Sequence, residues 1–414
     1  MTLRFGTADR PDVRAGTVAE LLALSPGERA GEPLAWLRDG TGFVGWGQAW
    51  RLDPGAGPER FARAGAALAE AFAGWDGRGA APVAMAAFTF DPAAHGSFVR
   101  VPELLVHSGA AARAVAAGAG PDARPDALAP LAATVLPERA TADRVRYAGA
   151  SLPDLLWLDA VAAATRLIDK GDIDKVVLAR DHAVWSEAPF EPRVLAARLA
   201  ARFPGCFTFV AEGLVGASPE MLVRRRGTRV ESLVLAGSAA RGDGAADDAA
   251  RGDALLASAK DRAEHAFAVA SVREALAPLC RTLESDAEPS LLRLDNVQHL
   301  ATRFGGTLAE PAPSALALAG ALHPTAAVCG TPTAEALEVI RELEGMERGR
   351  YTGPVGWVDA RGDGEFAIAL RCAELSGARA RLFAGAGIVA ASLPEAELEE
   401  TRLKLRAMQS AFAD

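Results

Sequence analysis

Two pairs of acidic residues occur at helical spacing in distant parts of the chain. Asp261 and Glu264 are three positions apart, as are Glu397 and Glu400, and Lys404 follows Glu400 by four positions. Side chains at this spacing share one face of a helix. If the two pairs faced each other, a hard cation such as Mg²⁺, which prefers oxygen ligands, would relieve their repulsion. Taken singly, each pair is also typical of a solvated helix face.

Arg371 and a glycine pair are candidates for holding an anion. In a strand over residues 365–371, Ala367 and Ala369 would point to the same side as Arg371 and leave room in front of its guanidinium. An arginine can grip a carboxylate through two parallel hydrogen bonds, although a structural ion pair is an equal alternative. Gly385 and Gly387 form a Gly-Ala-Gly turn whose N–H groups could approach an anion, and too little chain follows for a dinucleotide-binding unit.

One lysine and one glutamate could act as base and acid. Lys175 begins the apolar run KVVLAR, where burial would lower the pKa of its amine and make it a workable general base. Glu220 follows a Gly-Ala-Ser-Pro turn, which could project its carboxyl into an apolar cleft and raise its pKa. The alternatives are a lysine at a strand end that reaches solvent and an ordinary loop carboxylate.

Composition restricts the class of protein. The chain has 414 residues, of which 50% are hydrophobic and 23% are charged, and its net charge is −9. These values indicate a folded protein and argue against a nucleic-acid partner. The four cysteines are far apart, and there is neither an apolar N-terminal segment nor an uncharged run of membrane-spanning length. We therefore expect a cytoplasmic protein without a membrane partner.

The pattern of elements predicts an α+β fold with antiparallel sheets, because strands occur in runs with helices grouped between them. The segment 108–146 is expected to be a surface connection with some helix. The clearest element is a C-terminal meander of strands 355–359, 365–372 and 378–384, followed by a helix that opens with a capping box at Ser392. The other expected elements are helices over 59–74 and 155–170, strands over 175–180, 206–212 and 229–234, and one or two long helices within 245–283.

Together these segments resemble the chorismate-utilising enzymes and, among them, the isochorismate synthases. The resemblance follows the family order over residues 150–410, whereas residues 1–140 correspond to the family's variable N-terminal part. It implies a single domain over residues 1–414, with two large antiparallel sheets packed together and surrounded by helices. The matching segments are 175–180 (KVVLAR), 216–222 (GASPEML), 235–238 (LAGS), 260–265 (KDRAEH), 297–300 (VQHL), 322–332 (LHPTAAVCGTP), 350–372 and 384–404.

The resemblance also implies roles for individual residues. Lys175 would deprotonate the water that attacks ring carbon C2 of chorismate, and Glu220 would protonate the hydroxyl that leaves C4. Arg371, with the Gly385–Gly387 backbone, would hold the enolpyruvyl carboxylate. Mg²⁺ would take the ring carboxylate, with Lys404 nearby. Direct metal ligands would be Glu264 and Glu400, with Asp261 and Glu397 close to them, and the substrate pocket would include Gly237, His299, Ala327, Tyr351 and Phe383.

Within this family, the resemblance favours a magnesium-dependent isomerase that acts on chorismate as a monomer. Lys175 and the LAGS motif disfavour the branches that add ammonia, so no glutamine amidotransferase subunit is expected. Tyr351 keeps open a salicylate synthase, which would release pyruvate from isochorismate. A chorismate-binding subunit without catalysis is a further alternative. The product could serve menaquinone, siderophore or salicylate biosynthesis.

Overall fold

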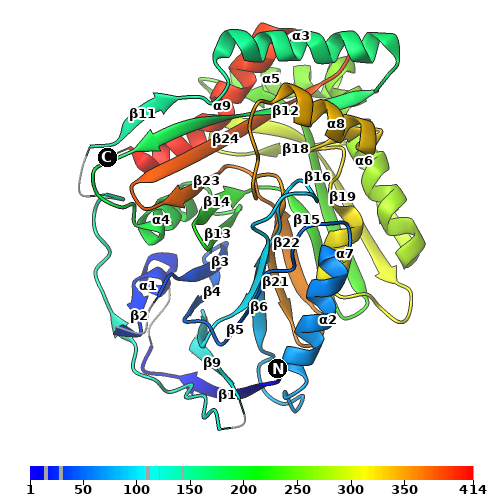
Figure 1. The fold of residues 1–414 in the computed structure, drawn as a ribbon. Coiled ribbons are helices and arrows are strands. Elements are labelled where there is room, and N and C mark those ends of the chain that lie inside the picture. The colour runs from blue at the N-terminus through cyan, green and yellow to red at the C-terminus, as the bar shows by residue number, and fades with distance from the viewer. Residues whose placement is uncertain (14–16, 28–30, 109–111, 121, 142–143, 414) are drawn as a thin grey trace.

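The computed structural model describes residues 1–13, 17–27, 31–108, 112–120, 122–141 and 144–413, and its strands form two large sheets (Figure 1). Within these residues, one sheet has twelve strands and the other has ten, and a separate pair joins β2 (Leu24–Ser25) to β10 (Ala132–Ala133). The strand pairs of both large sheets are antiparallel. The predicted α+β class with two large antiparallel sheets is confirmed.

The first sheet joins strands from both ends of the chain. Its path begins in the N-terminal part, crosses the middle of the sequence and ends near the C-terminal strands. In spatial order its strands are β1 (Leu3–Arg10), β9 (Ala112–Ala119), β8 (Leu104–His107), β4 (Thr41–Trp46), β3 (Leu34–Arg38), β13 (Phe207–Ala211), β14 (Leu214–Ser218), β23 (Cys372–Ser376), β24 (Arg379–Ile388), β12 (Lys175–Trp185) and β11 (Arg146–Gly149), with β20 (Gly330–Thr331) also paired to β12.

The second sheet likewise combines N-terminal strands with strands from the rest of the chain. Its longest pairing joins β16 and β19 over most of their length. In spatial order its strands are β17 (Cys280–Ser285), β19 (Val297–Leu308), β16 (Arg229–Ala240), β15 (Met221–Arg226), β22 (Gly364–Ile368), β21 (Pro354–Asp359), β6 (Val83–Ala87), β7 (Phe98–Val101) and β5 (Trp50–Leu52), with β18 (Ser290–Arg293) also paired to β19.

Helices cover the outer faces of both sheets (Figure 1). Helices α3, α4, α8 and α9 pack against the first sheet, whereas α2, α5, α6 and α7 pack against the second. Within the described residues the helices are α1 (Val18–Leu22), α2 (Arg60–Phe72), α3 (Asp154–Lys170), α4 (Pro192–Arg202), α5 (Ala245–Ala257), α6 (Ala259–Leu276), α7 (Ala315–Leu322), α8 (Thr333–Leu343) and α9 (Pro394–Phe412). No helix of the described chain combines the length and the apolar character needed to cross a membrane.

A hydrophobic core fills the space between the two sheets. Trp36 and Phe209 of the first sheet and Met85 and Val355 of the second belong to this core. Neighbouring residues on the same strands, such as Ala84 on β6, face the outer helices instead. Because both faces of each sheet are covered, strands such as β6 are apolar throughout rather than alternating.

Three expectations about elements were wrong. The described residues of 108–146 contain strands β9, β10 and β11 and no helix, and β9 pairs with β1 and β8 inside the first sheet. The C-terminal hairpins do form, but β21 and β22 belong to the second sheet and β23 and β24 to the first, so they are not one meander. Helix α9 has Leu393 as its N-cap with no side-chain cap, because the Ser392 hydroxyl accepts the Val389 N–H instead.

Candidate active site

Two short links carry the chain from one sheet to the other, and each carries a predicted site residue. Glu220 lies between β14 of the first sheet and β15 of the second, and Arg371 lies between β22 and β23. Each link is hydrogen-bonded to the strand that leads into the other: Ala217 N–H of β14 donates to the Arg371 carbonyl (3.1 Å), and Ile368 N–H of β22 donates to the Glu220 carbonyl (3.2 Å). The expected strand face of Arg371 was therefore wrong, because β22 ends at Ile368 and Arg371 has a φ of 46°.

The links open onto a cavity between the two sheets, with about 620 Å³ of empty space when its open mouth is included. The cavity is lined by strands of both sheets, by α6 and by α9. Of the predicted site residues, those that line it are Glu220, Gly237, Glu264, His299, Ala327, Tyr351, Arg371, Phe383, Gly385, Gly387 and Lys404. Lys175, Asp261, Glu397 and Glu400 lie outside this lining, on β12, α6 and α9.

The Glu220 carboxyl is buried and mainly protonated at neutral pH. Its Oε1 accepts the Leu235 N–H at 3.3 Å, and the residue is 4% exposed. Burial raises the pKa of Glu220 to about 8, although the Leu235 N–H and the charges of Lys175, Lys404 and Arg371 favour the carboxylate. A neutral carboxyl beside a cavity can donate a proton, which is the chemistry of a general acid.

Arg371 is oriented by His299 from the neighbouring sheet. Arg371 Nη2 lies 3.0 Å from His299 Nε2. A guanidinium has only donors, so Nε2 must accept and the imidazole proton must be on Nδ1. Nδ1–H then points at the Gly237 carbonyl (3.2 Å) and the Ser238 hydroxyl (3.0 Å). Burial, together with the charges of Arg371 and Lys404, lowers the pKa of His299 well below its usual value, which keeps this neutral form.

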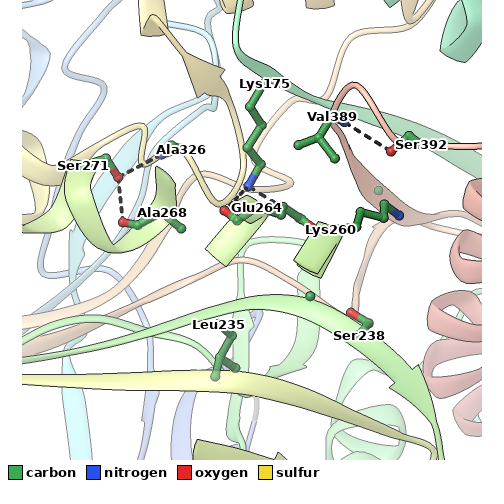
Figure 2. Close-up of polar contacts among 12 residues, drawn as sticks. Lys175, Leu235, Ser238, Lys260, Glu264, Ala268, Ser271, Ala326, Val389 and Ser392 are labelled. Carbon is green, nitrogen blue, oxygen red and sulfur yellow. Dashed lines mark hydrogen bonds and ion pairs between the residues drawn. The ribbon is translucent and has the colours of Figure 1, made fainter. Parts of the chain in front are cut away.

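Lys175 is fully buried at the start of β12 and reaches α6. Its Nζ lies 3.4 Å from both Oε1 and the backbone carbonyl of Glu264. Figure 2 shows the extended lysine side chain meeting Glu264, with Lys260 one turn away on the same helix. Burial lowers the pKa of Lys175, although Glu264 opposes this, and burial raises the pKa of Glu264. Both shifts favour uncharged forms, so the Lys175 amine is suited to accept a proton.

The Gly385–Gly387 segment is strand rather than turn, which corrects the expectation. Both glycines lie within β24, opposite Ala179 and Val177 of β12. A Cβ at Gly387 would lie 1.9 Å from Glu264 Oε1, so only glycine lets the carboxylate approach the strand. At Gly385, the carbonyl accepts a hydrogen bond from Lys404 Nζ at 2.9 Å. The glycines therefore make room for the side chains of Glu264 and Lys404 beside β24.

The four predicted metal ligands are near one another but do not form a ligand cluster. Glu264 pairs with Lys175, Glu397 with Lys260, and Glu400 Oε1 lies 2.6 Å from Lys404 Nζ. Asp261, in the first turn of α6, packs against the bulge at Gly237, where an added Cβ would lie 3.1 Å from the Asp261 Cβ. Nowhere in the described chain are three or more His, Cys, Asp or Glu side chains grouped closely enough to hold a metal ion.

The donor set nevertheless fits a hard cation. Burial raises the pKa values of Glu264 and Glu397, and the charge of Glu400 raises both further. Three carboxyl groups from two helices therefore lie close enough to repel one another, and they offer only oxygen donors. In this structure, each of the three carboxyl groups lies against a lysine: Glu264 against Lys175, Glu397 against Lys260 and Glu400 against Lys404.

Sequence reasoning missed several residues of the site. Ser238, the last residue of the LAGS motif, lines the cavity but was not predicted to have a role. Val177, Val328 and Thr352 also line the cavity and were not predicted as site residues. Behind them lies a buried ion pair, Glu344–Arg348, which was also not predicted. Its spacing of four residues is typical of an exposed helical pair, so only the tertiary structure reveals its burial.

The family of the chain follows from a match to the profile of a protein family. Residues 35–413 match the profile described as chorismate binding enzyme, which is most of the chain. The chain belongs to the chorismate binding enzyme family. The match includes every residue assigned above to the cavity, so this chorismate binding enzyme carries its candidate site inside the region that defines the family.

Individual relatives of this chorismate binding enzyme have more specific names. It is 45% identical over 256 residues to isochorismate synthase DhbC of Bacillus subtilis, which covers 59% of this chain and 64% of that protein. It is 44% identical over 284 residues to the putative isochorismate synthase MenF of Mycobacterium tuberculosis, which covers 65% of this chain and 76% of that protein. The chain thus spans slightly under two thirds of the first relative and about three quarters of the second.

A solved structure shares the two-sheet architecture. The crystal structure of a putative 2,3-dihydroxybenzoate-specific isochorismate synthase, DhbC from Bacillus anthracis, matches with a TM-score of 0.77 at 32% identity. The match covers 94% of this chain and 96% of that one. The fold described above is therefore similar along nearly the whole chain to that of a solved relative.

Proposed function

We propose that this protein is an isochorismate synthase, an isomerase that converts chorismate into isochorismate. The observation that carries the proposal is that a buried amine and a buried carboxyl lie close enough for their charges to interact. Lys175 enters from β12 and Glu220 from the link between the sheets. The charge of each residue influences the pKa of the other. The names of the two relatives at 44–45% identity support the same reaction.

The cavity suits a ring that carries two carboxylates. Arg371 would hold the enolpyruvyl carboxylate through guanidinium N–H groups that His299 does not use. Tyr351 and Phe383 stack with ring centroids 4.9 Å apart and supply a flat wall for the ring. Lys404, beside Gly385, would lie near the ring carboxylate.

Magnesium would be held by Glu264 and Glu400, with Asp261 and Glu397 close enough to act through water. Bound there, the ion would neutralise the ring carboxylate and withdraw electron density from the diene. The lysine partners of Glu264 and Glu400 would then be free of their carboxylates. For Lys175, this would leave the amine available to the reaction.

The proton steps follow from the two buried groups. The water that attacks ring carbon C2 would give a proton to the Lys175 amine, and the hydroxyl that leaves C4 would take a proton from Glu220. One water is consumed and another is released, so substrate and product are isomers. Exchange of protons with solvent restores the neutral amine and the protonated carboxyl. No oxidant or reductant is needed.

We expect this isochorismate synthase to work in the cytoplasm and without a partner subunit. All four cysteines are free thiols in the described structure, as expected in a reducing cytoplasm. Water is the nucleophile of the proposed reaction, so no subunit is needed to supply ammonia. We therefore expect the purified chain to be active alone.

The test is an assay of the purified protein with chorismate and Mg²⁺, with products separated by chromatography. Isochorismate as the sole product is the expected result, and Lys175→Met serves as the matched inactive control. Salicylate released with pyruvate would instead identify a salicylate synthase, the alternative that Tyr351 in the cavity wall keeps open. Unchanged chorismate under these conditions would refute both enzymes and leave a binding role.

A further inference from the structure

A buried arginine behind the cavity uses every hydrogen-bond donor that it has. Arg348 is 4% exposed and follows α8 in sequence. Its Nε–H and one Nη2–H donate to Glu344. The other Nη2–H donates to the Val177 carbonyl at 2.7 Å, and Nη1 donates to the Val328 carbonyl (2.8 Å) and the Thr352 hydroxyl (3.1 Å). The five N–H groups of the guanidinium thus have five acceptors.

Three of these acceptors belong to residues that line the cavity. Val177, Val328 and Thr352 come from three separate segments of the chain, and Arg348 itself does not line the cavity. Thr352 has a φ of 61°, in the left-handed region, and its N–H donates to the carbonyl of Ala369, which belongs to the link that carries Arg371. One guanidinium therefore fixes three parts of the cavity wall from behind.

Glu344 and Arg348 also take the place of a neighbouring strand along β12. The short strand β20 pairs with β12 at Lys175 and Val176, and Val177 N–H still donates to the Cys329 carbonyl. Beyond this point, the Val177 carbonyl is bound by Arg348, and Ala179 N–H donates to Glu344 Oε1 at 2.8 Å. The ion pair thus satisfies the next backbone groups of a buried edge, which would otherwise be unpaired.

We propose that Glu344 and Arg348 form a positioning unit that holds β12, and with it Lys175, in register with the opposite wall of the cavity. This rests on the proposed function, because Lys175 is the base of that reaction and lies two residues before Val177. A buried ion pair is often no more stabilising than apolar residues of similar volume, so stability alone does not account for charges at this place.

The unit depends on the shape of the guanidinium as well as its charge. A lysine ammonium has three donors on one atom and cannot reach acceptors on Glu344, Val177, Val328 and Thr352 together. A glutamine in place of Glu344 keeps the size of the side chain but brings N–H donors against the donors of Arg348 and Ala179. Arg348→Lys and Glu344→Gln should therefore loosen β12 without touching the substrate.

The experiment compares these variants with Asp181→Asn. Asp181 is a buried carboxylate on the same strand, bound to Ser151 and Arg381 and absent from the cavity lining. We expect Arg348→Lys to lower kcat by about 10- to 100-fold with KM within about threefold, as for a misplaced catalytic group. Glu344→Gln should lower kcat by about tenfold. Asp181→Asn should keep kcat within about threefold, with each variant assayed well below its own Tm.

Each outcome decides the proposal. Equal kcat for the Arg348→Lys and Asp181→Asn proteins would overturn it, and if Arg348→Lys does not fold, an unchanged kcat for Glu344→Gln would do so. If the wild-type protein does not convert chorismate, the proposed function fails. The positioning unit is then tested without activity, by amide hydrogen exchange of residues 175–180. Faster exchange in Glu344→Gln than in Asp181→Asn then supports the unit, and equal exchange overturns it.

Discussion

Replacing Glu220 with glutamine removes the proposed acid while keeping the shape of the side chain. The glutamine carbonyl can still accept the Leu235 N–H that now binds Glu220 Oε1. Since general acid–base catalysis contributes about 10²–10⁴-fold, we expect kcat to fall by a factor in this range. Glu374→Gln is a matched control. Glu374 lies on β23, forms an ion pair with Arg350 and does not line the cavity.

The pH dependence of the wild-type rate follows from the pKa of about 8 for Glu220. The protonated form is the active one, so the rate falls as pH rises through this value. About nine tenths of the carboxyl is protonated at pH 7 and about one tenth at pH 9 in the protein without substrate, which predicts a roughly tenfold lower kcat/KM at pH 9. Lys175 has the opposite effect on the pH dependence of the rate. Its amine must be neutral to accept a proton, so activity falls at low pH.

The same shift predicts how stability changes with pH. A carboxyl with a pKa of 4.5 when unfolded and about 8 when folded binds its proton more tightly in the native state. Its contribution to stability is fully present below pH 4.5 and is lost as pH rises through about 8. At ~1.4 kcal/mol per unit, the loss between pH 5 and pH 8 is about 3–4 kcal/mol. The Glu220→Gln protein lacks this slope and should be the more stable protein at pH 8.

Two measurements check this reasoning. Isochorismate formation is followed from pH 6 to pH 10 for the wild-type, Glu220→Gln and Glu374→Gln proteins, and unfolding by denaturant is measured at pH 5 and pH 8. A wild-type kcat/KM that stays flat from pH 7 to pH 9.5, or a Glu220→Gln kcat within threefold of wild type, would refute the acid role. Equal pH slopes of stability in both proteins would refute the buried, protonated state.

Three further substitutions test the other roles. Lys175→Met should abolish turnover while chorismate still binds in calorimetry, and normal turnover would contradict the base assignment. Glu400→Gln should raise the Mg²⁺ concentration for half-maximal activity by at least about tenfold, and wild-type activity that EDTA leaves unchanged would remove the metal from the proposal. Arg371→Ala should lower kcat/KM by about 10²–10³-fold, with little rescue by Arg371→Lys, since a lysine cannot form two parallel hydrogen bonds. An unchanged kcat/KM would rule out Arg371 as the anchor.

Hydrophobic periodicity and turn residues predicted helices and hairpins that form within one short segment of the chain. The helix over 155–170 and the hairpin through Gly362 and Gly364 are both present. The spacing of the acidic pairs correctly placed Asp261 with Glu264 on one helix, α6, and Glu397 with Glu400 on another, α9. Which cavity residues belong together was not predictable from spacing, and it came from the family resemblance.

The errors occur where distant parts of the chain decide local structure. Alternation from Phe366 to Leu370 predicts a strand that continues to Arg371, but the chain must leave one sheet and enter the other there. Glycines are rare inside strands, so Gly385 and Gly387 suggested a turn. Their place in β24 is explained by Glu264, which lies more than a hundred residues away in sequence and fills the space of the missing Cβ.

The charges around the cavity explain why a cation and an acidic substrate are expected to bind together. The pairs of Lys175 with Glu264 and of Lys404 with Glu400 sum to zero charge, whichever partner holds the proton. Among the described residues that line the cavity, Arg371 then carries the one positive charge without a carboxylate partner. A substrate with two carboxylates leaves one of them unneutralised, and a divalent cation at Glu264 and Glu400 would supply the missing charge. Loss of the Glu400 charge should therefore weaken the binding of the metal and, through it, of the substrate.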